Sequence, residues 1–212
     1  MPDPFDTPIV RSQDSDELRR AIGHRTVILA SVSPRRRAIL ESCGIAIRVI
    51  QPAVEEPPPS HRDSRSWVRR WALRKAQSAA GQLHRGLIIA ADTIVVLKGR
   101  AMGKPVDADD ARGMLMQLSG RVHQVITGMA VIETGRNRQV TGTEVSGVQF
   151  KTLTPDDIEA YLGTTEPWDK AGAYAVQGYA GRFITAVEGP VDNVVGLPVR
   201  RLAQLVRRVT AR

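Results

Sequence analysis

Three consecutive arginines at positions 35–37 stand where the sequence predicts the first turn of a helix. Ser33 is a favourable N-cap and Pro34 suits the first helical position, so the helix is expected directly after a short buried strand. Cations are unfavourable at this end because the helix dipole is positive there. The conflict disappears if backbone N–H groups and arginines hold an anion together. The pattern therefore predicts a phosphate-binding site.

Helical spacing separates the three arginines. At about 100° per residue, Arg36 falls on the apolar side of the helix and Arg35 lies at its edge. Arg37 points away and precedes Glu41 by four residues, which suits an exposed ion pair. Ordinary surface arginines are the alternative interpretation. We adopt it for Arg37 and favour the anion site for Arg35 and Arg36.

Asp92 is the second chemical signal. It directly follows the apolar run 87–91, so we expect it at the C-terminal end of a buried strand, where open α/β sheets place ligands. A carboxylate there could bind a divalent cation or take a proton from water. An aspartate that only caps the next turn is the alternative, and position alone leaves the two open.

Two lysines are placed by their neighbours. Lys75 projects from the apolar side of a helix predicted to begin near Ser66 and to end near Ala80. It must snorkel outwards or meet a negative partner, and either a phosphate or a buried carboxylate would serve. Lys104 stands between a glycine and a proline, which makes a constrained turn that fixes the direction of the ammonium group.

A glycine-rich region covers residues 169–181. Small residues there let the backbone approach a ligand, and Gln177 offers both a donor and an acceptor to a nucleobase edge. A structureless loop is the alternative, but the interspersed Tyr174 and Val176 argue against it. Glu55 and Glu56, in a proline-rich loop, resemble ordinary surface charge.

Composition narrows the class of protein. The net charge of +8 attracts nucleic acid, acidic membranes or phosphorylated small molecules without choosing among them. One cysteine, Cys43, allows no intrachain disulfide and fits a reducing compartment. No apolar run reaches the length of a membrane span, and no zinc-type spacing, Walker A loop or dinucleotide fingerprint is found. Arg, Lys, Asp, Glu and Gln therefore suit phosphate chemistry with a hard cation.

The predicted elements indicate a mixed α/β fold with a substantial antiparallel part. Residues 1–25 are expected to be a mobile extension carrying one short helix over 15–22, and residues 26–212 to form a single domain. Strands are predicted over 45–50, 87–91, 122–132, 139–150 and 183–187. Helices are predicted to start near residues 34, 66, 107, 154 and 198.

The ordered motifs resemble the Maf family of nucleoside triphosphate pyrophosphatases. The likeness runs from residue 28 to about residue 205 and rests on these segments: LASVSPRR (29–36), EE (55–56), KA (75–76), ADTIV (91–95), GKP (103–105), LSGRVH (118–123), DKAGAY (169–174), QG (177–178) and VGLP (195–198). Each motif is weak alone, but their order is specific.

The resemblance implies hydrolysis of a nucleoside triphosphate between its α and β phosphates, with a divalent cation, Mg²⁺ or Mn²⁺. The implied fold is an elongated mixed sheet with flanking helices and two lobes around a central cleft, similar to inosine triphosphate pyrophosphatases. A cytoplasmic location is implied, with no membrane and no specific nucleic acid as partner. The oligomeric state is not fixed, and a homodimer is left open.

The resemblance also implies roles for individual residues. Asp92 would be the general base or hold the metal, with Glu56 as a further metal ligand. The residues expected at the phosphates are Arg35, Lys75 and Lys104. Those linked to base choice are Arg35, Thr93 and Gln177. The further residues expected to bind substrate are Ser31, Ser33, Arg36, Asp169 and Lys170. The motif over 169–178 is similar to the dTTP/UTP subgroup, and a basic nucleic-acid-binding or nucleotide-sensing protein with little catalysis is the alternative.

Overall fold

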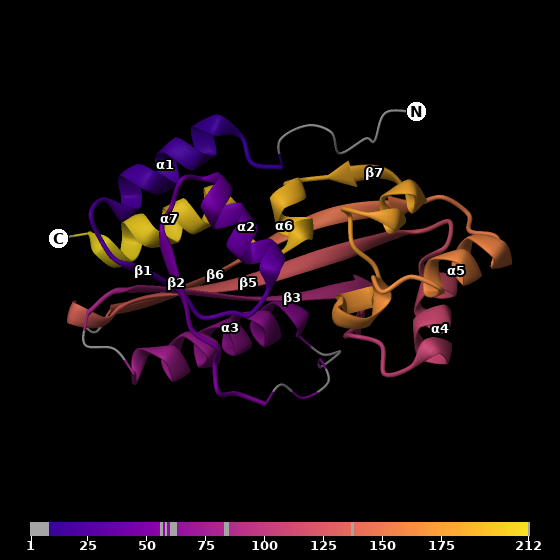
Figure 1. The fold of residues 1–212 in the computed structure, drawn as a ribbon, viewed down its shortest axis with the longest axis horizontal. Helices are drawn as coiled ribbons and strands as arrows, with labels where there is room; N and C mark the ends of the chain where they lie inside the picture. The colour runs from indigo at the N-terminus through magenta and orange to yellow at the C-terminus, as the bar shows by residue number, and fades with distance from the viewer. Residues whose placement is uncertain are drawn as a thin grey trace.

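The computed structural model describes residues 9–55, 57, 59, 63–82, 85–136 and 138–211. Its strands are β1 (Val27–Leu29), β2 (Ile47–Val49), β3 (Leu87–Leu97), β4 (Arg100–Met102), β5 (Val122–Glu133), β6 (Arg138–Phe150) and β7 (Ile184–Glu188). These strands form one mixed sheet in the order β2–β1–β3–β5–β6–β7, with β4 paired to β3. The pairs β2–β1 and β1–β3 are parallel, and the long strands β3, β5 and β6 pair with one another antiparallel (Figure 1).

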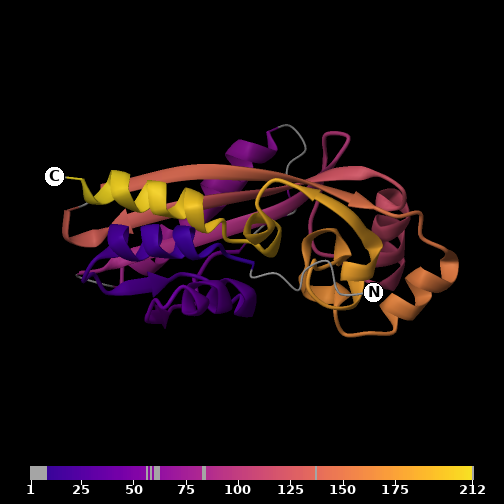
Figure 2. The same cartoon turned by 90° about the horizontal axis from the view of Figure 1, so that it is seen from above.

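Helices cover both faces of this sheet. They are α1 (Ser12–Ile22), α2 (Pro34–Ser42), α3 (Ser64–Ala80), α4 (Ala108–Leu118), α5 (Pro155–Leu162), α6 (Val191–Val195) and α7 (Val199–Thr210), with four short 3₁₀ turns, η1 (Thr134–Arg136), η2 (Pro167–Asp169), η3 (Ala171–Ala173) and η4 (Tyr179–Phe183). Helix α3 covers one face, and α1, α2 and α7 lie across the sheet from it (Figure 1). Helices α4 and α5 pack at the far end, so the molecule has two halves along one elongated sheet (Figure 2).

Helix α3 lies close to the sheet because small residues face it. Ala72 and Ala76 are fully buried against Ala90, and Gly128 of β5 stands opposite the start of the helix. A Cβ at Gly128 would lie 2.3 Å from the backbone carbon of Val68, so no side chain fits there. This close approach brings the inward side of α3 within reach of polar groups on β3.

The position predicted for Asp92 is wrong. The residue lies in the middle of β3, paired with Gly128, and not at a strand end. The β-branched run that follows it continues the strand because β5 pairs with β3 from Leu87 to Val96. The strand that ends here is β1, whose last pair with β3 is Leu29 with Ile89.

Beyond the end of β1, one edge of β3 has no strand beside it until β4 begins to pair at Val95. The Leu87 N–H and the Ile89 C=O bond to the β1 side. Because backbone direction alternates along a strand, the N–H and C=O groups of Ala91 and Thr93 point towards the same edge. Within the described residues, the sheet therefore has a notch at positions 90–94 of β3.

The expected N-terminal extension is not wholly separate from the domain. Helix α1 starts three residues earlier than predicted, and its Leu18 and Ile22 are buried in the same apolar cluster as α7. Arg207 of α7 also binds Glu17 at 3.2 Å. The pattern of apolar and charged residues in α1 covers only a few turns, so it did not predict from sequence that α1 would pack against α7.

The capping residues predicted from sequence are confirmed for two helices. Asp107 caps α4 by accepting from the Asp110 N–H, and Thr154 caps α5 in a reciprocal capping box, both as predicted. The two long strands predicted over 122–132 and 139–150 are confirmed as β5 and β6. In the part of the chain that the structure describes, no helix combines the length and the apolarity that a membrane crossing requires.

Asp192, at the start of α6, is a buried carboxyl group with a structural role. Its Oδ2 accepts a hydrogen bond of 2.7 Å from the N–H of Val199, the first residue of α7. Burial raises the pKa of Asp192 to about 6, although the hydrogen bonds from Val199 and Asn193 act in the opposite direction. At neutral pH this carboxylate is therefore ionised in the folded protein, and its buried charge lowers the free energy of unfolding.

We predict that Asp192→Asn stabilises the protein at pH 7 by up to about 3 kcal/mol. The amide oxygen can still accept from Val199, while the buried charge is removed. Because the folded pKa is raised above the unfolded one, the stability contributed by protonation is complete below about pH 4 and is lost as the pH rises through 6.

Denaturant unfolding of both proteins at pH 4, 5, 6 and 7 measures this difference. The advantage of the asparagine variant should grow with pH across the series. A variant less stable than the parent at pH 7 would contradict the assignment of an unfavourable charge to Asp192.

Candidate active site

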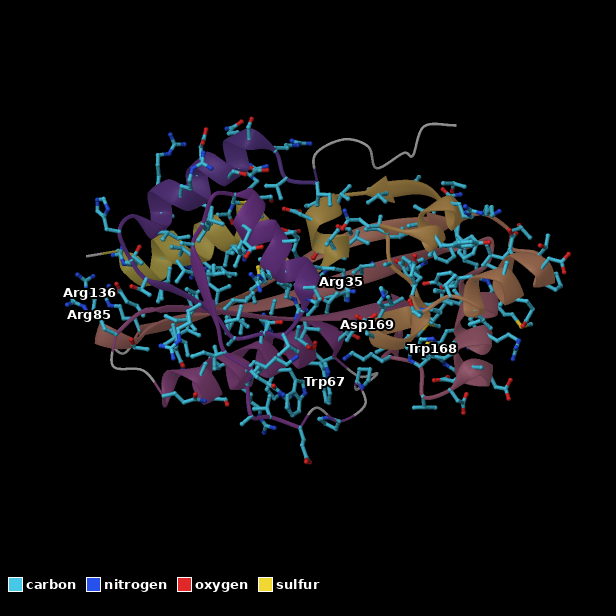
Figure 3. All side chains as sticks on the ribbon, in the orientation of Figure 1. Arg35, Trp67, Arg85, Arg136, Trp168 and Asp169 are labelled. Carbon is cyan, nitrogen blue, oxygen red and sulfur yellow. The ribbon has the colours of Figure 1, made fainter. Side chains whose placement is uncertain are left out.

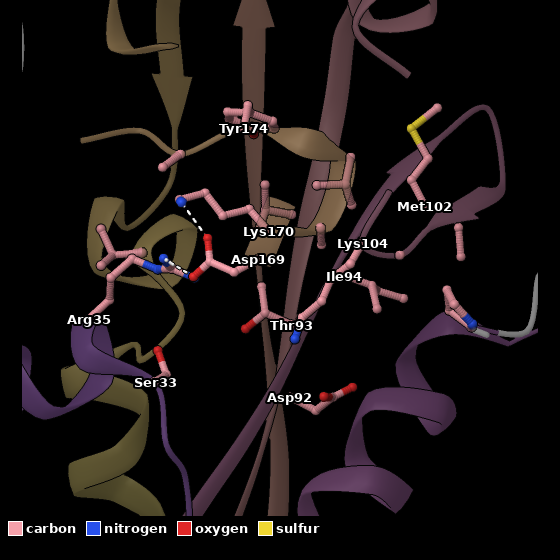
Figure 4. A pocket seen from close by; sticks show the side chains of 18 of the residues that line it. Ser33, Arg35, Asp92, Thr93, Ile94, Met102, Lys104, Asp169, Lys170 and Tyr174 are labelled. Atoms are coloured by element: carbon pink, nitrogen blue, oxygen red, sulfur yellow. Dashed lines mark hydrogen bonds and ion pairs between the residues drawn. The ribbon is translucent and has the colours of Figure 1, made fainter. Parts of the chain in front are cut away.

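A cavity of about 1180 Å³ surrounds the notch in β3 and extends between the two halves of the sheet. Its volume is ample for a nucleotide-sized ligand. Figure 4 shows the side chains around it converging from α2, β3, the turn after β4 and the turn η2. The described residues that the sequence predicted for the site all line it: Ser31, Ser33, Arg35, Arg36, Lys75, Asp92, Thr93, Lys104, Asp169, Lys170 and Gln177. Glu56, the predicted second metal ligand, lies outside the described residues.

The start of α2 forms one wall of the cavity. Ser33 is the N-cap residue and Pro34 the first helical residue, as predicted, but no side chain caps the helix within the described chain. The Ser33 N–H donates instead to the hydroxyl of Ser31, at 3.2 Å. An uncapped N-terminus beside the cavity keeps the electrostatic preference for an anion that the arginines suggested.

Arg36 connects three separate parts of the chain. Its guanidinium group donates to the hydroxyl of Ser31 at 3.2 Å, to the hydroxyl of Thr93 at 3.0 Å and to the carbonyl of Gly196 at 3.0 Å. The loop after β1, the notch of β3 and the end of α6 are thereby held together. A planar fork of donors suits this task, whereas a lysine could not reach all three acceptors.

The hydroxyl of Thr93 has a fixed orientation. Thr127 donates its hydrogen to the carbonyl of Asn193 at 3.1 Å, so the 2.9 Å contact between the two threonine hydroxyls needs Thr93 as the donor. Thr93 in turn accepts from Arg36. A directed chain of hydrogen bonds therefore runs from the cavity wall to α6 and orients the groups that face a ligand.

Lys75 and Asp92 form a buried ion pair at the notch. The Lys75 Nζ lies 2.7 Å from the Asp92 Oδ1, and the two side chains are 12% and 7% exposed. The sequence left either a phosphate or a buried carboxylate as the partner of Lys75, and in this structure the partner is the carboxylate of Asp92. The pair fixes the direction of Asp92, and both groups line the cavity.

Asp169 binds two cations at once on the other side of the cavity. Arg35 donates to Oδ2 at 3.2 Å, and Lys170 donates to Oδ1 at 2.5 Å (Figure 4). Partial burial raises the pKa of Asp169, but the Lys170 hydrogen bond and the Arg35 charge outweigh that effect and hold it below its ordinary value. Arg35 and Asp169 lie between the two halves of the molecule (Figure 3).

Lys104 and Gln177 are exposed side chains on the cavity wall. Lys104 extends from the turn after β4 towards the level of Asp92 (Figure 4). The turn is tight because a Cβ at Gly103 would lie 3.1 Å from the ring of Pro59. Glycine at this position therefore lets the turn pack closely, as its neighbours in sequence suggested.

Sequence reasoning gave no role to two residues of the cavity lining or to a buried histidine that contacts a third. Arg100 and Trp67 line the cavity. His123 is buried, and its Nε2 lies 2.7 Å from the hydroxyl of Tyr174, which forms part of the wall. Burial lowers the pKa of His123 to about 4, so its ring is neutral at pH 7. The sequence motif over 118–123 contains His123, but its hydrogen-bond partner Tyr174 lies 51 residues away, so the sequence did not indicate this contact.

Comparison with known proteins found a matching family model, similar relatives and a solved structure. A family model described as Maf-like protein matches residues 26–209. A dTTP/UTP pyrophosphatase of Pelotomaculum thermopropionicum is 45% identical over 87% of this chain and 96% of its own length. Proteins of the same name from Clostridioides difficile and Desulforamulus reducens are 42% and 45% identical over 86% of this chain, and 94% and 96% of their own lengths. A solved structure, the Ham1 protein of Staphylococcus aureus, gives a TM-score of 0.49 at 12% identity, covering 87% of this chain and 99% of its own.

We predict strong energetic coupling between Lys75 and Asp92. Lys75→Met or Asp92→Asn alone should lower the free energy of unfolding by about 3 kcal/mol, because each leaves one buried polar partner behind. The double variant should lose about 2 kcal/mol less than the sum of the two. Urea unfolding of the four proteins measures the coupling.

The exposed pair Arg37 and Glu41, at 2.8 Å, is the matched control. The same cycle with Arg37→Gln and Glu41→Gln should give a coupling below about 0.5 kcal/mol. Equal coupling energies in the two cycles would contradict the view that burial strengthens the interaction between Lys75 and Asp92.

Proposed function

The chain belongs to the Maf-like protein family, and on that premise we propose that it hydrolyses dTTP and UTP to the nucleoside monophosphate and pyrophosphate. Relatives that are 42–45% identical over nearly their whole length bear the name dTTP/UTP pyrophosphatase. The proposed reaction cleaves the bond between the α and β phosphates. The proposed location is the cytoplasm, in keeping with a single cysteine that is buried and free.

The observation that carries the proposal is the charge of the cavity. Its described lining includes six Lys or Arg residues against three Asp residues. A triphosphate carries several negative charges, and cleavage adds charge to the leaving pyrophosphate. Cations held in place by the fold stabilise that charge where it develops, with little reorganisation.

We assign the phosphates to the side of the cavity where the cations gather. Lys104 and Arg35 approach from different walls and would bind phosphate oxygens from different directions. Ser31 and Ser33, with the uncapped start of α2, would supply neutral donors. Gln177 and Thr93 are proposed for the nucleobase, because an amide can donate to and accept from a pyrimidine edge.

A divalent cation fits the donor set of the described cavity. Those residues contain no group of three or more His, Cys, Asp or Glu side chains that could enclose a metal by themselves. Mg²⁺ is commonly bound through one or two carboxylates together with substrate phosphates, and Asp92 is a buried carboxylate in the right place. Asp92 would hold Mg²⁺ or Mn²⁺, with Glu56 proposed as a second ligand. When bound, the cation would supply Lewis-acid stabilisation of the phosphate charge and make a nearby water more acidic.

Asp92 is the proposed general base or the residue that anchors the cation. Its position in the middle of a strand limits its motion, and the 2.7 Å contact with Lys75 fixes one carboxylate oxygen. In the first role Asp92 accepts a proton from the attacking water. Lys104 then stabilises the charge that builds up on the leaving pyrophosphate.

We predict that the purified protein with Mg²⁺ or Mn²⁺ releases pyrophosphate, and not orthophosphate, from dTTP and UTP. A panel of standard and modified nucleotides, assayed by ³¹P NMR, identifies both product and preference. EDTA should abolish turnover, and excess Mg²⁺ should restore it. Orthophosphate as the first product, or turnover that EDTA does not affect, would contradict the proposal.

We predict that Asp92→Asn lowers kcat for dTTP at least 100-fold, because the amide can neither accept the proton nor bind the cation well. Asp109→Asn, on the exposed side of α4, is the charge-matched control and should retain parental turnover. Circular dichroism checks that both variants are folded at the assay temperature. Parental kcat in folded Asp92→Asn would remove Asp92 from the mechanism.

A further inference from the structure

Asp169 is placed where a ligand anion is expected. Its two carboxylate oxygens lie against two different cations, Oδ2 against Arg35 at 3.2 Å and Oδ1 against Lys170 at 2.5 Å. Two oxygens of one phosphate group would meet the same pair of cations in the same way. All three residues line the cavity proposed for the nucleotide.

Lys170 has a further hydrogen bond that does not involve Asp169, and the backbone of Arg35 is fixed by its helix. Lys170 also donates to the backbone carbonyl of Glu166, and that glutamate is itself held by the N–H of Tyr179 at 2.8 Å. Arg35 belongs to the first turn of α2, which is anchored through its neighbour Arg36. Removing the carboxylate therefore leaves Lys170 in place and Arg35 within reach of an anion beside the cavity.

Asp169 itself can leave this position at a modest cost. Its side chain is 56% exposed, while that of Lys170 is only 12% exposed. Exposed ion pairs contribute little because water competes for both partners. The carboxylate is thus a weakly held anion on two cations, of which Lys170 is largely buried and separately hydrogen-bonded.

We propose that Asp169 is a built-in competitor for anionic ligands, which must displace its carboxylate from Arg35 and Lys170 before they can bind both cations. The inference rests on the proposed binding of phosphates in this cavity. The competition lowers the affinity for substrate and for the product pyrophosphate alike. It therefore favours rapid product release and keeps the cations paired between turnovers.

The test is the affinity of Asp169→Asn for inorganic pyrophosphate, measured by isothermal titration calorimetry in the presence of EDTA. EDTA removes divalent cations, so a metal cannot contribute to the measured binding. Pyrophosphate lacks a nucleobase, so the measurement reports only the phosphate-binding part of the cavity. The dissociation constant should fall about tenfold relative to the parent at low salt, and the difference should shrink in 0.5 M NaCl. Asp169→Ser is the second variant and should behave in the same way.

Two controls make the result specific. Asp156→Asn removes the same charge from the exposed start of α5, outside the cavity lining, and should bind pyrophosphate like the parent. In an Arg35→Gln background, the gain from Asp169→Asn should be reduced, because one of the two competed cations is missing. An equal gain in Asp156→Asn would show a general charge effect and overturn the inference.

Unchanged or weaker pyrophosphate binding by both Asp169 variants would also overturn it. Turnover of dTTP by the parent protein is measured separately. If the parent hydrolyses dTTP but Asp169→Asn binds pyrophosphate no more tightly than the parent, the competitor role of Asp169 is refuted and the proposed hydrolysis is not. A gain without turnover upholds the competitor and refutes the proposed hydrolysis.

Discussion

The arrangement depends on one constraint in the sheet: β1 ends at Leu29, whereas its neighbour β3 continues to Leu97. The difference leaves one edge of β3 uncovered over positions 90–94, and Asp92 lies in the middle of that stretch. Helix α3 brings Lys75 to the same point because alanines and Gly128 allow it to pack tightly. A longer β1 would fill the notch, and a bulkier residue at position 128 would move the lysine away.

Charge is balanced locally around this notch rather than over the whole chain. The buried Asp92 is neutralised by Lys75, and the exposed Asp169 is shared by Arg35 and Lys170. Arg36 donates to two hydroxyl groups and one carbonyl group, and these hydrogen bonds fix the direction of its charge. With six Lys or Arg residues against three Asp residues, the described lining of the cavity has a net positive charge, which suits a ligand with several negative charges.

Local features of the sequence predicted local features of the structure. The caps at Asp107 and Thr154 and the Arg37–Glu41 pair depend on residues within four positions of one another. Features set by distant partners were beyond such reasoning. Asp92 was expected at a strand end because nothing near it reveals that β5, more than thirty residues later, extends the strand. The carbonyl that orients Arg36 lies 160 residues away, and the second cation on Asp169 lies 134 residues away.

The central claim is that a triphosphate lies along the uncovered edge of β3, beside Asp92. A crystal structure with Mg²⁺ and a dTTP analogue whose α–β linkage resists hydrolysis tests it most directly. The account predicts the α phosphate next to Asp92, with Lys104 in contact with the phosphate chain. A nucleotide bound elsewhere, with the notch filled only by water, would contradict it.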